Sequence, residues 1–211
     1  MEETYTELKD KVVNGDQGAA PELVKKLLDA GESPKAILDK ALVPAMDIVG
    51  ENFQNNIFLI PELLVAERAM KACMKMLEPL LAETGVKPRG KAMICTVKGD
   101  LHDIGKNIVA AMLKGAGYEI IDLGTDVAPA KIAEETASRN PDIICLSALL
   151  TTTMRNMKDT IEALRSNGTR DKVKVLVGGA PLTQKYADEI GADAYGKDAV
   201  EAVRIARDFA G

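Results

Sequence analysis

The stretch that decides the fold is residues 92–107, AMICTVKGDLHDIGKN. It begins with a short, mostly apolar run, Ala92–Val97, which predicts a buried strand. The glycine and the charged residues that come next predict a turn, and the apolar spacing from Gly105 onward predicts a helix. We therefore expect a strand, a polar loop and a helix in this order.

Four more units of the same kind follow along the chain. Five consecutive strand–helix units predict a parallel sheet with helices on both faces. We expect an α/β fold of the flavodoxin-like (Rossmann-like) kind, with five strands in the order 2-1-3-4-5, over residues 91–211. The later strands are predicted at 119–123, 143–147, 173–177 and 192–195, and the helices at about 105–116, 129–139, 153–167, 181–190 and 198–209.

The part of the chain before the sheet contains only helical patterns. Asp16 and Ser33 are suited to cap helices, and Pro34 and Pro61 are suited to a first helical turn. We expect a four-helix bundle domain over residues 1–86 and a linker over 87–90. The predicted helices are 2–14, 17–30, 34–55 and 61–84, with short connections that favour antiparallel packing.

Composition excludes several classes of function. Apolar residues make up 46% of the chain and charged residues 28%, as in ordinary globular proteins. The formal charge of −5 offers no basic face for nucleic acid. We expect no secretory signal, no membrane span and no membrane partner. Three widely spaced cysteines predict reduced, buried thiols in a cytoplasmic protein.

Polar and glycine-rich residues gather where the predicted strands end. The carboxyl ends of parallel strands share one edge of the sheet, and ligands of such folds bind there. We therefore favour a ligand site at this edge over the alternative that these residues only form turns. The stretches concerned are 98–102, 122–126, 147–153, 178–181 and 195–196.

His102 is the only histidine of the chain. A lone histidine can simply belong to the surface or the core. A zinc or iron site needs about three protein ligands, and neither a second histidine nor clustered cysteines accompany it. The remaining interpretation is that His102 forms a single axial bond to a metal that a macrocycle already holds. Ligating histidines commonly donate their second ring N–H to a carboxylate, and Asp100 is better placed for this than Asp103, which is suited to cap the helix near Ile104.

These residues resemble a known family. The patterns Asp100-x-His102-x-x-Gly105, Ser147-x-Leu149 and Gly178-Gly179 resemble the three-part signature of cobalamin-binding domains of the base-off, His-on type. Residues 97–109 resemble the same segment of methionine synthase. The length of the chain and its helical region resemble the stand-alone corrinoid proteins of methylamine, methanol and glycine-betaine methyltransferase systems.

The resemblance implies a role for each of these residues. His102 is expected to be the lower axial ligand of cobalt, with Asp100 hydrogen-bonded behind it. Ser147 and Leu149 are expected to contact the nucleotide tail of the corrinoid, which passes close to the backbone of Gly178-Gly179. Thr153 stands where methionine synthase has the serine of a hydrogen-bond relay with the aspartate. The remaining expected contacts of the cofactor are Gly99, Asp103, Ile104, Gly105, Thr151 and Tyr195.

The helical domain is implied to cap the upper face of the cobalt. Phe53, Ile60 and Leu64 are the residues expected to shield the bound methyl group. Many relatives have Phe-Leu-Pro where this chain has Leu59-Ile60-Pro61, so the shape of the shield is expected to differ. Spacing alone would make Phe53 a residue of the bundle core.

The function implied is that of a methyl carrier without turnover of its own. Cobalt would take a methyl group from a substrate-specific methyltransferase and yield it to a second methyltransferase, which delivers it to a thiol of the coenzyme M kind or to tetrahydrofolate. A reductive activator is a further expected partner. The alternatives are a cobalamin-dependent sensor, the small subunit of a carbon-skeleton mutase, and a phosphorylatable receiver domain on a similar sheet.

Overall fold

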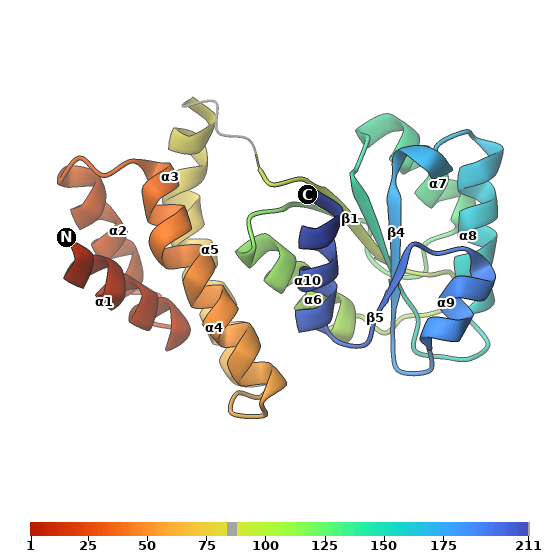
Figure 1. The fold of residues 1–211 in the computed structure, drawn as a ribbon, viewed down its shortest axis with the longest axis horizontal. Coiled ribbons are helices and arrows are strands. Elements are labelled where there is room, and N and C mark those ends of the chain that lie inside the picture. The colour runs from red at the N-terminus through yellow and green to blue at the C-terminus, as the bar shows by residue number, and fades with distance from the viewer. Residues whose placement is uncertain (84–87, 211) are drawn as a thin grey trace. The chain divides into compact units, whose positions relative to one another are not determined.

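The computed structural model describes residues 1–83 and 88–210, which form two compact units that divide at Pro88 and Arg89 (Figure 1). The predicted end of the helical domain at residue 86 and the end of its last helix at 84 lie outside the described residues. So does the first residue of the predicted linker 87–90. Each unit has its own apolar core and is described by itself.

The described part of the helical unit contains four helical segments, as predicted: α1, α2, a continuous segment formed by α3, η1 and α4, and α5. Helices α1 and α2 pack against each other, α4 packs on α1, and α5 packs on both α2 and α4. The predicted cap at Ser33 is confirmed, because its Oγ accepts the Ala36 N–H. The prediction for Asp16 is wrong: the N-cap of α2 is Gly18, and the Asp16 carboxylate accepts the Gly18 and Ala19 N–H groups in the turn before the helix. The bounds are α1 Glu2–Val13, α2 Ala19–Asp29, α3 Pro34–Ile37, η1 Leu38–Leu42, α4 Val43–Gln54 and α5 Ile60–Glu83.

The rod predicted as one helix over 34–55 contains a π-helical turn, η1, between α3 and α4. Pro44 explains the position of this turn. Its ring nitrogen has no hydrogen to donate to Lys40, four residues earlier, and its ring would collide with the carbonyl there. The wider π turn accommodates the proline without ending the rod.

The second unit contains the predicted parallel sheet, in the order β2-β1-β3-β4-β5. Central strand β1 pairs with β3 so that Ala92 lies opposite Ile143 and Thr96 opposite Ser147. The three central strands are almost wholly buried, which explains their continuous apolar sequences. The strands are β1 Lys91–Thr96, β2 Glu119–Asp122, β3 Ile143–Ser147, β4 Lys174–Gly178 and β5 Ala194–Gly196.

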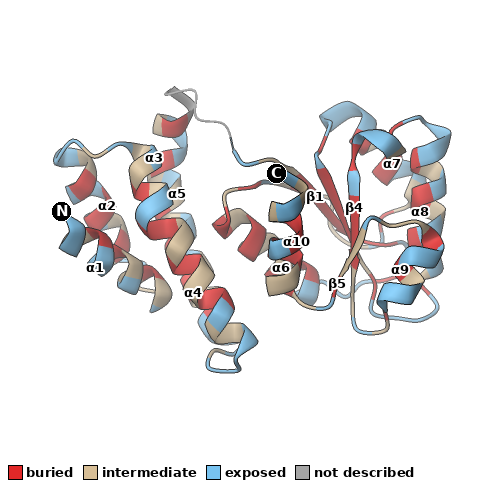
Figure 2. Ribbon diagram, viewed as in Figure 1, coloured by how far each residue is buried: buried red, intermediate tan, exposed pale blue. Residues whose placement is uncertain are grey.

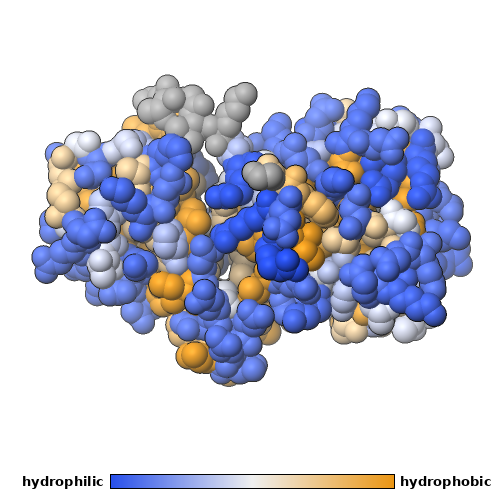
Figure 3. Space-filling model, in the orientation of Figure 1, coloured by the Kyte–Doolittle hydropathy of each residue, from blue (hydrophilic) through white to orange (hydrophobic). Residues whose placement is uncertain are grey.

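Helices cover both faces of this sheet (Figure 1). Helices α7, α8 and α9 lie on one face and α6 and α10 on the other. Buried residues lie along the strands and along one stripe of the helices (Figure 2), whereas the outer side of α8 and α9 is mainly hydrophilic (Figure 3). The helices are α6 Ile104–Gly115, α7 Pro129–Arg139, α8 Arg155–Ser166, α9 Gln184–Ile190 and α10 Ala199–Ala210, with a 3-10 turn, η2, at Arg170–Lys172.

Four predicted starts are wrong by two or more residues. The helix predicted from residue 17 begins at Ala19, and the strand predicted from residue 192 begins at Ala194. The other two have a local reason. The helix predicted to begin at residue 181 begins at Gln184, because Thr183 acts as its N-cap and its hydroxyl accepts the Tyr186 N–H. The helix predicted from residue 153 begins at Arg155, after a turn in which the Thr153 N–H donates to Leu150 O. Among the described residues, every helix is too short or too polar to cross a membrane.

Candidate functional site

A tight turn after β1 places Asp100 at the carboxyl edge of the sheet. The Asp100 N–H donates to Val97 O at 3.1 Å, which closes a four-residue turn. Gly99 occupies the third position with φ of +79°, the left-handed value that a type II turn requires there. The side chain of Asp100 is fully buried. The turn therefore carries a charged group into the protein immediately beside the end of β1.

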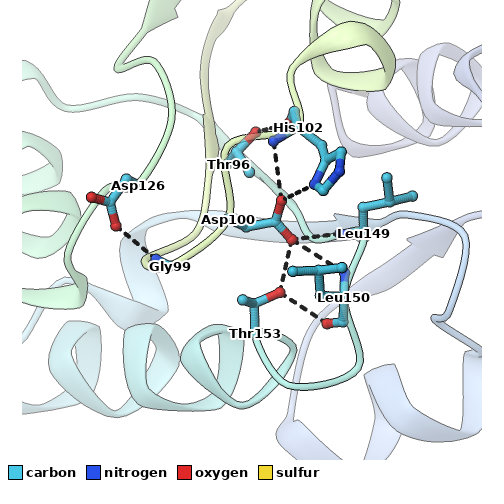
Figure 4. A network of polar contacts seen from close by, with 8 residues as sticks. All are labelled: Thr96, Gly99, Asp100, His102, Asp126, Leu149, Leu150 and Thr153. Carbon is cyan, nitrogen blue, oxygen red and sulfur yellow. Dashed lines mark hydrogen bonds and ion pairs between the residues drawn. The ribbon is translucent and has the colours of Figure 1, made fainter.

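The carboxylate of Asp100 joins three segments of the chain (Figure 4). Its Oδ1 accepts the main-chain N–H of His102 at 3.1 Å and lies 2.7 Å from the His102 Nδ1. Its Oδ2 accepts the Thr153 hydroxyl at 2.8 Å. The N–H groups of Leu149 and Leu150 donate to the same oxygen at 2.8 and 3.2 Å. The predicted contacts of Asp100 with His102 and with Thr153 are confirmed.

These donors decide the charge of Asp100. Burial alone would raise the pKa of this carboxyl group. Hydrogen bonds from the Leu149 N–H, the His102 ring and the Thr153 hydroxyl outweigh that effect and leave the pKa well below its ordinary value. Asp100 is therefore an ionised carboxylate near neutral pH, although no lysine or arginine pairs with it among the described residues.

An ionised Asp100 fixes the tautomer of His102. A carboxylate can only accept hydrogen bonds, so the ring proton of a neutral His102 resides on Nδ1. The lone pair then resides on Nε2, for which no hydrogen-bond partner exists among the described residues. The side chain is 52% exposed. His102 therefore presents an accessible, electron-rich nitrogen, as the ligand of a metal centre must.

The main chain around His102 is held by residues that sequence reasoning missed. The hydroxyl of buried Thr96 donates to His102 O at 2.8 Å. Asn156 of α8 donates to Lys98 O at 2.8 Å, and Asp126, after β2, accepts the Gly99 N–H at 2.7 Å. The only sequence indication was that Thr96 and Asp126 lie at strand ends.

Exposed apolar side chains surround this polar network. Among the described residues of the α/β unit, all of the large hydrophobic side chains that are exposed lie in two segments, residues 101–104 after β1 and residues 149–150 after β3. Leu101 precedes His102 in the loop after β1, Ile104 is the first residue of α6, and Leu149 and Leu150 follow β3 and donate their N–H groups to Asp100. A water-exposed apolar rim around a ligating nitrogen is the expected feature of a site that binds a flat, largely apolar group.

The other residues predicted in these two loops also lie at the carboxyl edge. Asp103 directly precedes α6, where its carbonyl accepts the Asn107 N–H and its carboxylate accepts the Asn107 side chain. A Cβ atom at Gly105 would meet nothing within 4 Å. Ser147 ends β3 beside Thr96, and Thr151 is exposed in the following turn.

The packing of the protein's own backbone explains the paired glycines Gly178 and Gly179. Gly179 has φ of +134°, and a Cβ there would come within 1.9 Å of Ala148 O. A Cβ at Gly178 would lie 3.1 Å from Gly196 O. Close backbone packing thus requires glycine at position 179, whatever ligand approaches. Tyr195 lies in edge strand β5, half-buried and opposite Val177.

The predicted shield residues belong to the helical unit. Phe53 and Leu64 are half-buried, and Ile60 at the start of α5 is exposed. Ile57 and Leu59 in the preceding loop are also exposed. Apart from Met1, the exposed large hydrophobic residues described in this unit therefore gather at the α4–α5 connection.

Side chains that commonly bind metals are not clustered in the part of the chain that the structure describes. The described residues contain no cluster of three or more His, Cys, Asp or Glu side chains that could hold a metal ion. Cys73, Cys95 and Cys145 are buried and unpaired, and burial raises the pKa of Cys73 and of Cys145 to about 12. A metal bound at His102 would therefore have to bring most of its ligands with it.

Comparisons with known proteins agree with this geometry. Two family models, each described as a B12 binding domain, match residues 90–204 and 4–78. Trimethylamine corrinoid protein 2 of Methanosarcina acetivorans is 42% identical over 96% of this chain and 94% of its own length. A cobalamin-binding protein from Desulfitobacterium hafniense superposes with a TM-score of 0.82 at 32% identity, covering 98% of both chains. A chain of the methanol:cobalamin methyltransferase complex from Methanosarcina barkeri gives 0.87 at 27% identity, covering 99% of this chain and 80% of that one.

Proposed function

This chain belongs to the B12 binding domain family, and we propose that it is a corrinoid protein that carries a methyl group between two methyltransferases. The observation that carries the proposal is the position of His102. Its accessible Nε2 belongs to a ring held by a buried carboxylate, and the same two segments of the chain carry exposed apolar side chains. That combination fits a macrocyclic cobalt complex bound through one axial nitrogen, in the base-off, His-on arrangement.

The residues present fit such a group. One protein nitrogen suffices, because the corrin ring supplies the four equatorial ligands. Leu101, Ile104 and Leu149 offer apolar surface to its lower face, and the open space at Gly105 leaves room against α6. Ser147, Thr151, Gly178, Gly179 and Tyr195 remain the proposed neighbours of the nucleotide tail.

When bound, cobalamin supplies a cobalt atom that can accept a methyl group and give it up again. The protein supplies control of the axial position. His102 would hold the metal through Nε2 while Asp100 accepts its Nδ1–H, which would make the ring a stronger donor. The Asp100 carboxylate would also keep the ring in one orientation.

The helical unit is proposed to protect the cofactor. Phe53, Ile60 and Leu64 would exclude water from the reactive metal. The methyl donor would be presented by a substrate-specific methyltransferase, and a second methyltransferase would deliver the group to a thiol or to tetrahydrofolate. A reductive activator would restore oxidised cobalt. Unpaired, buried thiols support a cytoplasmic location.

Binding is tested by reconstituting the protein with hydroxocobalamin and recording its visible spectrum. The wild type should give a histidine-coordinated spectrum, and His102→Ala should not. Added imidazole should restore the wild-type spectrum in His102→Ala, because it replaces the missing ligand. Lys185→Ala, an exposed change on α9, is the control. Identical spectra for the wild type and His102→Ala would refute axial ligation by His102.

Methyl transfer needs a second experiment. The reduced, cobalamin-loaded protein is mixed with methyltransferases encoded near its gene and with their methylamine or methanol substrates. Methylation of the bound cobalamin by one of them is expected. A cofactor that stays unmethylated with every partner, but whose illumination changes the association state of the protein, would favour the sensor instead.

A further inference from the structure

Asp126, in the loop between β2 and α7, has an unusual backbone. Its φ is +55°, in the left-handed region that side chains other than glycine, asparagine and aspartate rarely adopt. The neighbouring residues Gly124 and Val127 are hydrogen-bonded to Thr96 of β1 through their main chains. The protein thus fixes this loop against the end of β1 and holds Asp126 in a conformation that costs free energy.

Both polar groups of Asp126 are directed at the turn that carries Asp100. Its Oδ1 accepts the Gly99 N–H at 2.7 Å, and its own N–H donates to Asp100 O at 3.0 Å. Figure 4 shows Asp126 beside Gly99, on the side of the turn away from Thr153. The peptide groups on both sides of the Gly99–Asp100 bond are therefore fixed by one residue.

The position of His102 depends on that turn. Asp100 is the residue that joins His102 to Leu149 and Thr153, and a buried carboxylate with five hydrogen bonds tolerates little displacement. Rotation of the Gly99–Asp100 peptide would move the carboxylate away from donors that are themselves fixed to β3 and α8. The left-handed conformation of Asp126 is what allows its side chain and its N–H to meet the same turn.

We propose that Asp126 is a positioning residue for the axial histidine: it fixes the Gly99–Asp100 turn, and through Asp100 it fixes the direction of the His102 lone pair. That this lone pair binds cobalt rests on the proposed function. The mechanical role itself is a property of the protein without cofactor, so the two can be tested separately.

Three substitutions separate the contributions of Asp126. Asp126→Asn keeps an acceptor oxygen and tolerates the left-handed backbone. Asp126→Gly relieves the backbone strain but removes the acceptor, and Asp126→Ala removes the acceptor and adds strain. Asn140→Ala is the control: Asn140 has φ of +49° and caps the end of α7, at the opposite edge of the sheet, so its replacement strains the backbone without touching the site.

The first measurement uses the cofactor-free protein and nuclear magnetic resonance. In Asp126→Gly, the Gly99 amide should exchange roughly tenfold to a hundredfold faster, because a hydrogen bond to a charged acceptor is lost. The His102 Nδ1–H resonance should shift and lose protection at the same time. Asp126→Asn and Asn140→Ala should leave that resonance in place. An unchanged His102 resonance in Asp126→Gly would overturn the proposal, even if Gly99 exchanged faster.

The second measurement loads the variants with hydroxocobalamin and reduces it to the cobalt(II) form. Electron paramagnetic resonance then reports an axial nitrogen as a threefold splitting of the cobalt lines. We expect Asp126→Gly and Asp126→Ala to lose a large part of the split signal, with His102→Ala as the zero reference. Full splitting in Asp126→Gly would contradict the proposal. A wild type without splitting would refute axial ligation instead, and the cofactor-free measurement would still decide the role of Asp126.

Discussion

Each edge of the sheet holds one charged carboxylate, and different kinds of groups stabilise the charge at the two edges. At the amino edge, Asp193 accepts the Val175 N–H and pairs with Arg170 at 2.8 Å and Lys174 at 3.6 Å, beside a polar cavity of about 480 Å³. At the carboxyl edge, Asp100 is held by N–H and O–H donors and by a histidine. A guanidinium carries its charge permanently, whereas an imidazole can lose its charge.

The difference supports the proposal that the carboxyl edge, and not the amino edge, holds the metal. The charge of Asp193 is already neutralised by fixed cations. The charge of Asp100 is stabilised by N–H and O–H dipoles, and among the described residues no permanent cation pairs with it. Among the described parts of this unit, large hydrophobic side chains are exposed at the carboxyl edge alone, which offers a ligand apolar surface to cover.

Removing the buried carboxylate should have the largest effect on the fold. In Asp100→Ala the donors on Leu149, Leu150 and Thr153 lose their acceptor in a buried place. We expect the free energy of unfolding of the cofactor-free protein to fall by about 3 kcal/mol, measured by urea denaturation. The split axial signal of bound cobalamin should also disappear. A loss below about 0.5 kcal/mol, the range of ordinary surface changes, would contradict this account of Asp100.

Asp100→Asn adds a test by pH. The folded protein lowers the pKa of Asp100, so ionisation stabilises the fold above the ordinary carboxyl pKa of roughly 4. This contribution is lost as the pH falls further toward the depressed pKa. The free energy of unfolding should therefore be higher for the wild type than for Asp100→Asn at pH 7, where the whole difference is present. This difference should shrink below about pH 4. A difference that grew on acidification would have the wrong sign.

At the amino edge, removal of a partner of the carboxylate should destabilise the fold without affecting the His102 site. Arg170→Leu removes the cation from Asp193 and the donors to Val173 O and Gly191 O, all partly buried. A loss of about 2 kcal/mol in the free energy of unfolding is expected. The spectrum of bound cobalamin should stay unchanged. Arg165→Leu, which removes an exposed arginine lining the same cavity, should change stability by less than about 0.5 kcal/mol.

The contrast between the edges also separates what sequence could predict from what it could not. Strand order, the site edge and the contacts of Asp100 with His102 and Thr153 follow from strand–helix periodicity and from a resemblance in side chains. The donors on Leu149 and Leu150 are main-chain groups, which any residue provides, so no side-chain pattern indicates them. The roles proposed for cofactor contacts remain predictions.

Other features depend on contacts that are distant in sequence. Gly179 was expected to admit a ligand, but the carbonyl of Ala148 already requires a glycine there. Asp126 lies 27 residues from the Gly99 N–H that it accepts, and its left-handed backbone follows from how the loop packs on β1. The π turn before Pro44 was missed because apolar spacing over 34–55 fits one continuous helix equally well.

A smaller effect is expected when one donor to Asp100 is removed. Thr153→Val keeps the shape of the side chain and deletes the hydroxyl that donates to Asp100 Oδ2. The free energy of unfolding should fall by about 1 kcal/mol. Thr153→Ser retains the hydroxyl and should retain the axial signal of bound cobalamin. If the serine variant lost that signal as fully as the valine variant, the methyl group of Thr153 rather than its hydroxyl would be the important part.

The smallest effect on the fold, and a clear one on binding, is expected at the apolar rim. Leu101 is 72% exposed, so Leu101→Ser should leave the unfolding curve of the cofactor-free protein unchanged. If the corrin ring covers this side chain, the same change removes apolar contact from the complex alone. The affinity for hydroxocobalamin, measured by fluorescence quenching or calorimetry, should fall about tenfold. Leu101→Met preserves apolar area and should bind as the wild type does. Unchanged affinity in Leu101→Ser would mean that the ring does not cover this side chain, and that the exposed rim serves a partner protein instead.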